Sequence, residues 1–173
     1  MHGLLNLIIK NYNTMLIRTP FTEKIDVRIT RWMSKYGIWL LRISIGIVFF
    51  WFGFLKFFPG VSPAEGIAVK TIHVITFNLL SDRTILVILA IWESVIGIGL
   101  ITGIYLREIL LLLFLQMLGT LTPLFFFPEE VFTKVPYAPT LEGQYIIKNL
   151  VLVSAAIVIG ATVRGGRLNP DPE

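Results

Sequence analysis

The sequence predicts an all-α integral membrane four-helix bundle with an amphipathic N-terminal helix and an interfacial or re-entrant outer loop. Three observations lead to this prediction. Of the 173 residues, 55% are hydrophobic and only 15% are charged, whereas soluble domains carry about 25% charged residues. Four apolar stretches are each long enough to cross about 30 Å of hydrocarbon, which takes roughly 20 helical residues. The segments between and beyond these stretches carry most of their basic residues on one side of the membrane, as in multi-pass membrane proteins.

The predicted spans are residues 37–58, 84–105, 108–127 and 145–163. Together they make a transmembrane bundle of residues 37–163, which follows an N-terminal arm of residues 1–36 and precedes a short tail of residues 164–173. The arm does not resemble a cleaved signal peptide, because its apolar run LLNLII is short and is followed by Lys10 and not by a small-residue cleavage site.

Residues 22–36 of the arm predict an amphipathic helix at the cytoplasmic membrane surface. Its two faces are apolar (Ile25, Ile29, Trp32, Met33, Tyr36) and basic (Lys24, Arg28, Arg31, Lys35). Such a helix lies on anionic lipid headgroups or docks a cytoplasmic partner. We favour the headgroups, because basic helices next to a membrane span commonly bind them.

Two connections between spans are expected on the outer side. Residues 59–82 contain an apolar stretch that is too short and too polar to span, so we expect an interfacial or re-entrant helix that caps the outer mouth of the bundle. Residues 128–144 are rich in proline and predict an ordered loop packed over the same face.

The loops also predict an orientation. Nine basic residues lie on the side that holds both termini, and three lie on the other side. The nine are Lys10, Arg18, Lys24, Arg28, Arg31, Lys35, Arg107, Arg164 and Arg167, and the three are Lys70, Arg83 and Lys134. Because positive loops stay inside, both termini are expected in the cytoplasm.

The first span carries two charges on one face. Arg42, Gly46, Phe49, Gly53 and Lys56 recur at helical spacing and so share that face. A charge near the bilayer centre costs on the order of 3 kcal/mol, so the face should contact another helix and not lipid. We expect Arg42 to extend toward the cytoplasm.

The second span offers the matching face. Glu93 and Gly97 are four residues apart, and glycines let helix backbones approach closely. We therefore predict that Lys56, Glu93 and Lys148 converge in the outer half of the bundle, with Gln116 and Tyr145 nearby. Two interpretations stay open: a buried ion pair that only fixes packing, or an outward-opening site for a polar or quinone-like headgroup. The residues identify no catalytic group.

The residue inventory limits the chemistry. The chain has no cysteine, and its histidines are His2 and His73. This excludes disulfides, thiol redox cycling and bis-histidine haem ligation inside the bundle, and no metal-ligand spacing occurs. We therefore expect no intrinsic haem, flavin or metal site. The lipid bilayer is the expected partner, and no nucleic-acid partner is expected.

Three segments resemble the DoxX family of small four-span bacterial membrane proteins. They are RISIGIVFFWFGFLKF, WESVIGIGLITGIYLR and LEGQYIIKNLVLVSAAIVIG, and the resemblance covers residues 37–163. Its most specific features are the arginine that opens the first span, the glycine three residues before Lys56, Glu93 in the second span, and Lys148 after GQYII.

The resemblance implies an accessory subunit of a membrane oxidoreductase or respiratory-type complex in the bacterial cytoplasmic membrane. Other membrane subunits would be its partners, and a homo-oligomer is an open alternative. Because the chain lacks cysteine and paired histidines that could carry electrons, any redox role would need a bound quinone, another bound cofactor or a partner subunit. The alternatives are a purely structural or assembly subunit and a small-molecule transporter. No span is broken into matched halves, which speaks against transport. A pocket that reaches Glu93 would favour a binding site, and a solid bundle would favour a scaffold.

Overall fold

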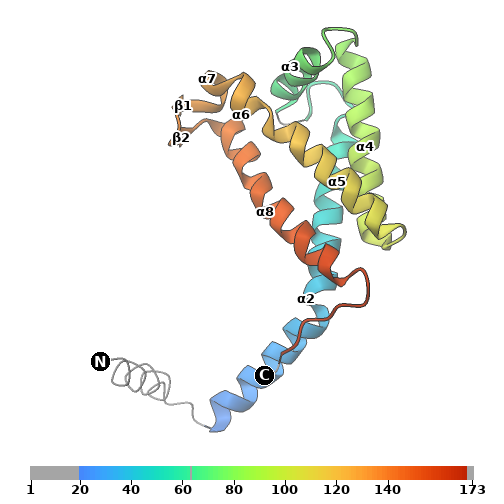
Figure 1. Ribbon diagram of the computed structural model, residues 1–173, viewed down its shortest axis with the longest axis vertical. Coiled ribbons are helices and arrows are strands. Elements are labelled where there is room, and N and C mark those ends of the chain that lie inside the picture. Colours follow the sequence, from blue (N-terminus) through green and yellow to red (C-terminus); the bar gives the residue numbers. More distant parts are fainter. Residues whose placement is uncertain (1–19, 63, 171–173) are drawn as a thin grey trace. The chain divides into compact units, whose positions relative to one another are not determined.

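The computed structural model describes residues 20–62 and 64–170, and these residues are almost entirely helical. The elements are α2 (Pro20–Leu55), α3 (Glu65–Ile75), α4 (Asp82–Thr102), α5 (Leu106–Leu121), α6 (Pro123–Phe126), α7 (Pro128–Val131), β1 (Phe132–Lys134), β2 (Ala138–Pro139) and α8 (Leu141–Thr162) (Figure 1). The predictions that concern His2, Lys10, Arg18 and the rest of residues 1–19 lie outside the described residues.

Four stretches within the described residues are long and apolar enough to cross a membrane: α2, α4, α5 together with α6, and α8. The predicted all-α membrane bundle is therefore confirmed, and the chain is a multi-pass membrane protein. The outward faces of these helices carry exposed large apolar side chains, among them Ile47, Ile91, Leu118 and Val158. A helix that is apolar both inside and outside the bundle fits a lipid environment and not water.

Helix α2 differs from its predicted boundaries. The amphipathic segment 22–36 and the first span form one continuous helix from Pro20 to Leu55. The junction holds Gly37 but no proline, and one glycine costs a helix only about 1 kcal/mol. The helix ends three residues earlier than predicted, where the Lys56 N–H bonds to the Gly53 carbonyl at 3.1 Å. This i to i+3 bond is the tighter turn that often closes a helix.

The described chain divides into two compact units. In the first, which holds the described residues up to Gly37 and those from Arg167 onward, the Ser34 hydroxyl donates to the Leu168 carbonyl at 2.5 Å. Ile29 and Trp32 are exposed there, so the apolar face expected from the sequence is unburied in this unit.

The second unit, Ile38–Gly166, contains the bundle. Helix α5 lies between α4 and α8 and packs against both (Figure 1). The main core cluster consists of Ile45, Phe49, Ile96, Leu100, Ile109, Leu110, Leu113, Met117, Ala156 and Ile159. These residues come from α2, α4, α5 and α8, so one apolar core joins the four spanning helices.

Glycines bring α2 and α4 together, as the sequence predicts. A Cβ atom at Gly53 would lie 2.7 Å from the Glu93 Cβ, and one at Gly46 would lie 3.0 Å from the Gly97 carbonyl oxygen. A Cβ at Gly97 would in turn collide with the backbone of Phe50. Small residues at such crossings allow the helix backbones to touch, and this contact sets the position of Glu93 next to the end of α2.

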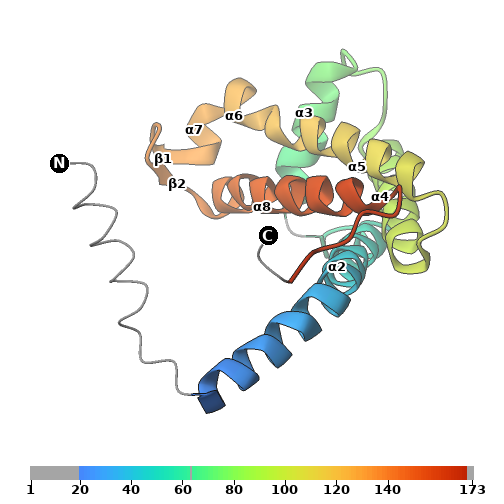
Figure 2. The same ribbon diagram turned by 60° about the horizontal axis from the view of Figure 1, so that its bottom comes forward.

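The connections contain more regular structure than predicted. The helix expected within residues 59–82 is α3, whereas residues 128–144, expected as a loop, hold α7 and an antiparallel hairpin of β1 and β2. Figures 1 and 2 both show α6, α7 and the hairpin beside the start of α8. The third span is also divided, because Pro123 lacks the N–H that would continue α5.

Helix α8 begins at Leu141, four residues before the predicted start. The Thr140 side chain accepts a hydrogen bond from the Gly143 N–H at 3.1 Å, which is the standard N-cap arrangement. The extra turn places Tyr145 inside the helix and not at its first residue.

Candidate functional site

The centre of the candidate site is the carboxylate of Glu93, which two side chains hold. The Lys56 ammonium donates to Oε2 of Glu93 at 2.6 Å, and the Gln116 amide donates to Oε1 at 2.9 Å. All three residues are buried, with exposed fractions of 8% for Lys56, 8% for Glu93 and 9% for Gln116. The end of α2, the middle of α4 and the middle of α5 therefore meet at one carboxylate, as the sequence predicts for these three residues.

This arrangement explains how two opposite charges are accommodated inside an apolar bundle. A buried carboxylate without a partner costs several kcal/mol, and a buried ion pair offsets that cost only when further hydrogen bonds satisfy it. Here the amide of Gln116 supplies such a bond to Glu93. The Lys56 ammonium also lies 3.4 Å from the Phe52 carbonyl oxygen.

Arg42 belongs to a different environment. Its guanidinium lies against Gly103, where a Cβ atom would collide with it. Gly103 ends α4 with a φ of +76°, a conformation that glycine adopts without strain. The last carbonyls of a helix carry a partial negative charge, so the end of α4 stabilises the Arg42 cation. The second charge of the first span thus lies at a helix terminus, and no ion pair joins it to a side chain of the described residues.

A cavity of about 500 Å³ opens beside the cluster. Its polar lining consists of Lys56, Glu93, Gln116, Thr120, Tyr145, Lys148 and Asn149. Its apolar lining includes Val48, Phe49, Phe52, Met117, Val151 and Leu152. The walls come from α2, α4, α5 and α8, with Ile67 and Ala68 of α3 at one end. A pocket of this size and mixed lining is typical of a small-molecule site.

Tyr145 and Lys148 line this cavity but do not bond to Glu93. The Lys148 ammonium lies 5.6 Å from the centre of the Tyr145 ring, and both residues are exposed. Among the described residues, no hydrogen bond or ion pair joins either of them to the Lys56–Glu93 pair. The two residues sit on α8, so the predicted five-residue cluster is a buried triad plus two side chains in another wall of the same cavity.

The sequence interpretation missed two polar residues of the cavity. Thr120 lies four residues after Gln116 and Asn149 lies four residues after Tyr145, and the Asn149 amide donates to the Thr120 hydroxyl at 3.3 Å. Helical spacing places each of them on the same face as a residue already identified. The i to i+4 pattern was therefore the signal that could have found both.

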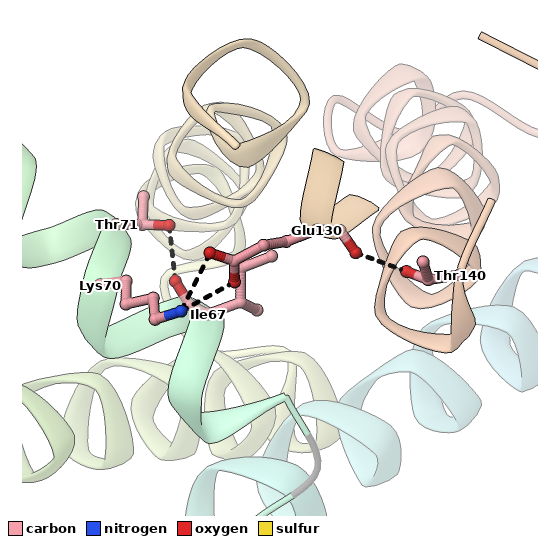
Figure 3. A network of polar contacts seen from close by, with 5 residues as sticks. All are labelled: Ile67, Lys70, Thr71, Glu130 and Thr140. Atoms are coloured by element: carbon pink, nitrogen blue, oxygen red, sulfur yellow. Dashed lines mark hydrogen bonds and ion pairs between the residues drawn. The ribbon is translucent and has the colours of Figure 1, made fainter. Parts of the chain in front are cut away.

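Helix α3 lines one end of the cavity with Ile67 and Ala68, and α7 packs against it. Ile67 packs against Val131 and Ile146 in a second buried cluster. Beside it, the Lys70 ammonium contacts both carboxylate oxygens of Glu130, at 2.9 and 3.0 Å (Figure 3). The Thr140 hydroxyl donates to the Glu130 carbonyl at 2.8 Å, so α7 is tied to the start of α8.

No group of three or more metal-ligating side chains occurs within residues 20–62 and 64–170. His73 contacts Asp82 at 2.7 Å and does not line the cavity. Comparison of the chain with protein-family models, curated proteins and solved structures gives no match. The resemblance to the DoxX family therefore rests on the sequence segments that carry it and stays a prediction.

Proposed function

We propose that this protein is a DoxX-like accessory subunit of a quinone-linked oxidoreductase or respiratory-type complex, and that its cavity binds a quinone headgroup or a small anion. The observation that carries the proposal is the cavity beside the buried Lys56–Glu93 pair. A scaffold subunit needs no such space, and protein interiors are otherwise close-packed. The expected setting is the bacterial cytoplasmic membrane, with both termini in the cytoplasm and the cavity in the outer half.

The polar lining suits a ligand with oxygen acceptors. Lys148 is a cation without a carboxylate partner among the described residues, and Tyr145 adds a hydroxyl to the same wall. Ammonium and hydroxyl groups both donate hydrogen bonds to carbonyl or anionic oxygens. Phe49, Phe52 and Met117 supply the apolar surface that a quinone ring would contact. The chain would position the ligand, and the electrons would come from a partner subunit.

The test is purification of the protein from its native membrane in mild detergent, with identification of co-purifying proteins and extraction of quinone. We expect stoichiometric quinone in the wild-type protein and at least a tenfold loss in Lys148→Met, because the variant keeps the apolar stem but removes the donor. Leu150→Met is the matched control, since Leu150 is exposed on α8 and does not line the cavity.

Two results would contradict the proposal. If no quinone is retained and added decylubiquinone does not bind, the quinone assignment is wrong. The structural or assembly role then becomes the better interpretation. Co-purification with no oxidoreductase subunit would remove the association with a redox complex.

A further inference from the structure

The cavity has one closed side and one open side. At the back, Phe49 of α2, Glu93 of α4 and Gln116 of α5 are each 9% exposed or less. On the α2 and α8 walls, Phe52 is 40% exposed and Val151 is 69% exposed, and Val48 is also exposed. All of these residues line the same cavity. The exposed lining therefore marks an opening between α2 and α8.

The opening lies between spanning helices, and the exposed lining residues Tyr145 and Lys148 continue it toward the start of α8. Val48 and Phe52 belong to α2, and Val151 belongs to α8, both of which are apolar enough to cross a membrane. At the end of the cavity next to α3, the lining residues Ile67 and Ile146 pack with Val131 in a buried cluster. A ligand that entered from water at that end would have to displace this cluster.

We infer that the ligand of this site enters sideways from the bilayer, between α2 and α8, and is an amphiphile with an apolar chain and a headgroup that accepts hydrogen bonds. The inference rests on the proposed function and narrows it, because a free water-borne anion is no longer the expected ligand. Lys148, Tyr145 and Asn149 receive the headgroup. Val48, Phe52 and Val151 contact the chain where it leaves the cavity for the lipid.

The charge distribution agrees with this assignment. The Lys56 ammonium and the Glu93 carboxylate lie 2.6 Å apart and neutralise each other. The net charge of the cavity lining is therefore the positive charge of Lys148. The apolar lining at the opening makes the entry of a hydrated ion costly, since its hydration shell would be lost. An amphiphile avoids that cost because its chain stays in an apolar environment throughout.

The experiment measures retention of two probes, decylubiquinone and lauric acid, by the protein in phosphatidylcholine nanodiscs, after subtraction of empty nanodiscs. Val48→Trp and Val151→Trp place a large side chain in the opening. Ile47→Trp and Val158→Trp are matched controls on the same two helices, since both positions are exposed and neither lines the cavity. We expect the first pair to lower retention of the bound probe at least tenfold and the second pair to change it less than twofold.

The outcomes separate this inference from the proposed function. If the opening variants retain the probe like wild type while Lys148→Met loses it, entry from the bilayer is wrong and the site stands. If lauric acid binds and decylubiquinone does not, entry from the bilayer stands and the quinone assignment is wrong. If neither probe binds, both proposals fail. Should a Trp variant unfold, Val151→Phe tests the same opening with a smaller side chain.

Discussion

The charged residues Arg42, Lys56, Glu93 and Lys148 have three kinds of environment, and the differences indicate their roles. Glu93 and Lys56 satisfy each other with the help of Gln116. Arg42 lies against the end of α4. Lys148 has no acidic partner among the described residues and faces the cavity. A charge without an acidic partner in a spanning helix is an indication of a ligand that supplies one.

The Lys56–Glu93 pair predicts an asymmetric response to mutation. Lys56→Met strands a buried carboxylate and should destabilise the protein by about 3–5 kcal/mol. Glu93→Gln should cost less, because the freed lysine can extend along its flexible stem toward a polar region. The double variant should recover part of the loss of Lys56→Met. Unfolding titrations in detergent measure these free energies, and wild-type stability of Lys56→Met would contradict the account.

Among the elements, α3 decides whether the cavity is closed at its end. Two kinds of contact hold it: the apolar packing of Ile67 on Val131 and Ile146, and the Lys70–Glu130 ion pair. The ion pair is half exposed, with side-chain exposures of 56% and 46%. Pairs of this kind contribute about 0–1 kcal/mol. The apolar contact should therefore dominate.

This balance can be measured by substitution in α3. Ile67→Ala should destabilise the protein by about 2–5 kcal/mol, since it empties a buried position, and should enlarge the cavity. Lys70→Met, the control on the same helix, should cost less than about 1 kcal/mol. Unfolding titrations and probe retention in nanodiscs test both variants. An equal loss of stability in the two variants would contradict this, because the ion pair would then contribute as much as the packing.

At the scale of the whole molecule, the arrangement of basic residues predicts how the chain is oriented in the membrane. Arg107 is the second residue of α5, at the connection from α4 on the side with nine basic residues, and Tyr137 lies in the hairpin on the side with three. Because the chain has no cysteine, Arg107→Cys and Tyr137→Cys each introduce a single thiol, and both positions are exposed. A membrane-impermeant maleimide should label position 137 in intact cells and position 107 only after permeabilisation. The reverse pattern would invert the topology.

Much of the bundle could be predicted because hydropathy and glycine spacing are local signals. The four spans followed from apolar length, and the Lys56–Glu93 contact followed from the glycines that share a face with each residue. The rest depends on information that is not local. Arg42 lies against a helix terminus, which no search for acidic side chains reveals. The continuity of α2 depends on Gly37 being too weak a helix breaker, and the opening beside Val151 depends on how α8 is placed.

The contact between α2 and α4 has a consequence for biogenesis. Lys56 directly follows α2 and Glu93 lies on α4, the first two spanning helices in chain order, and Gly53 brings these helices together at the pair. The acidic residue and its counter-charge therefore both belong to the first helical hairpin, and their contact requires neither α5 nor α8. The Glu93 carboxylate therefore has a counter-charge that does not depend on the later helices. Gln116 and the cavity walls of α8 then complete a polar centre that is already neutral.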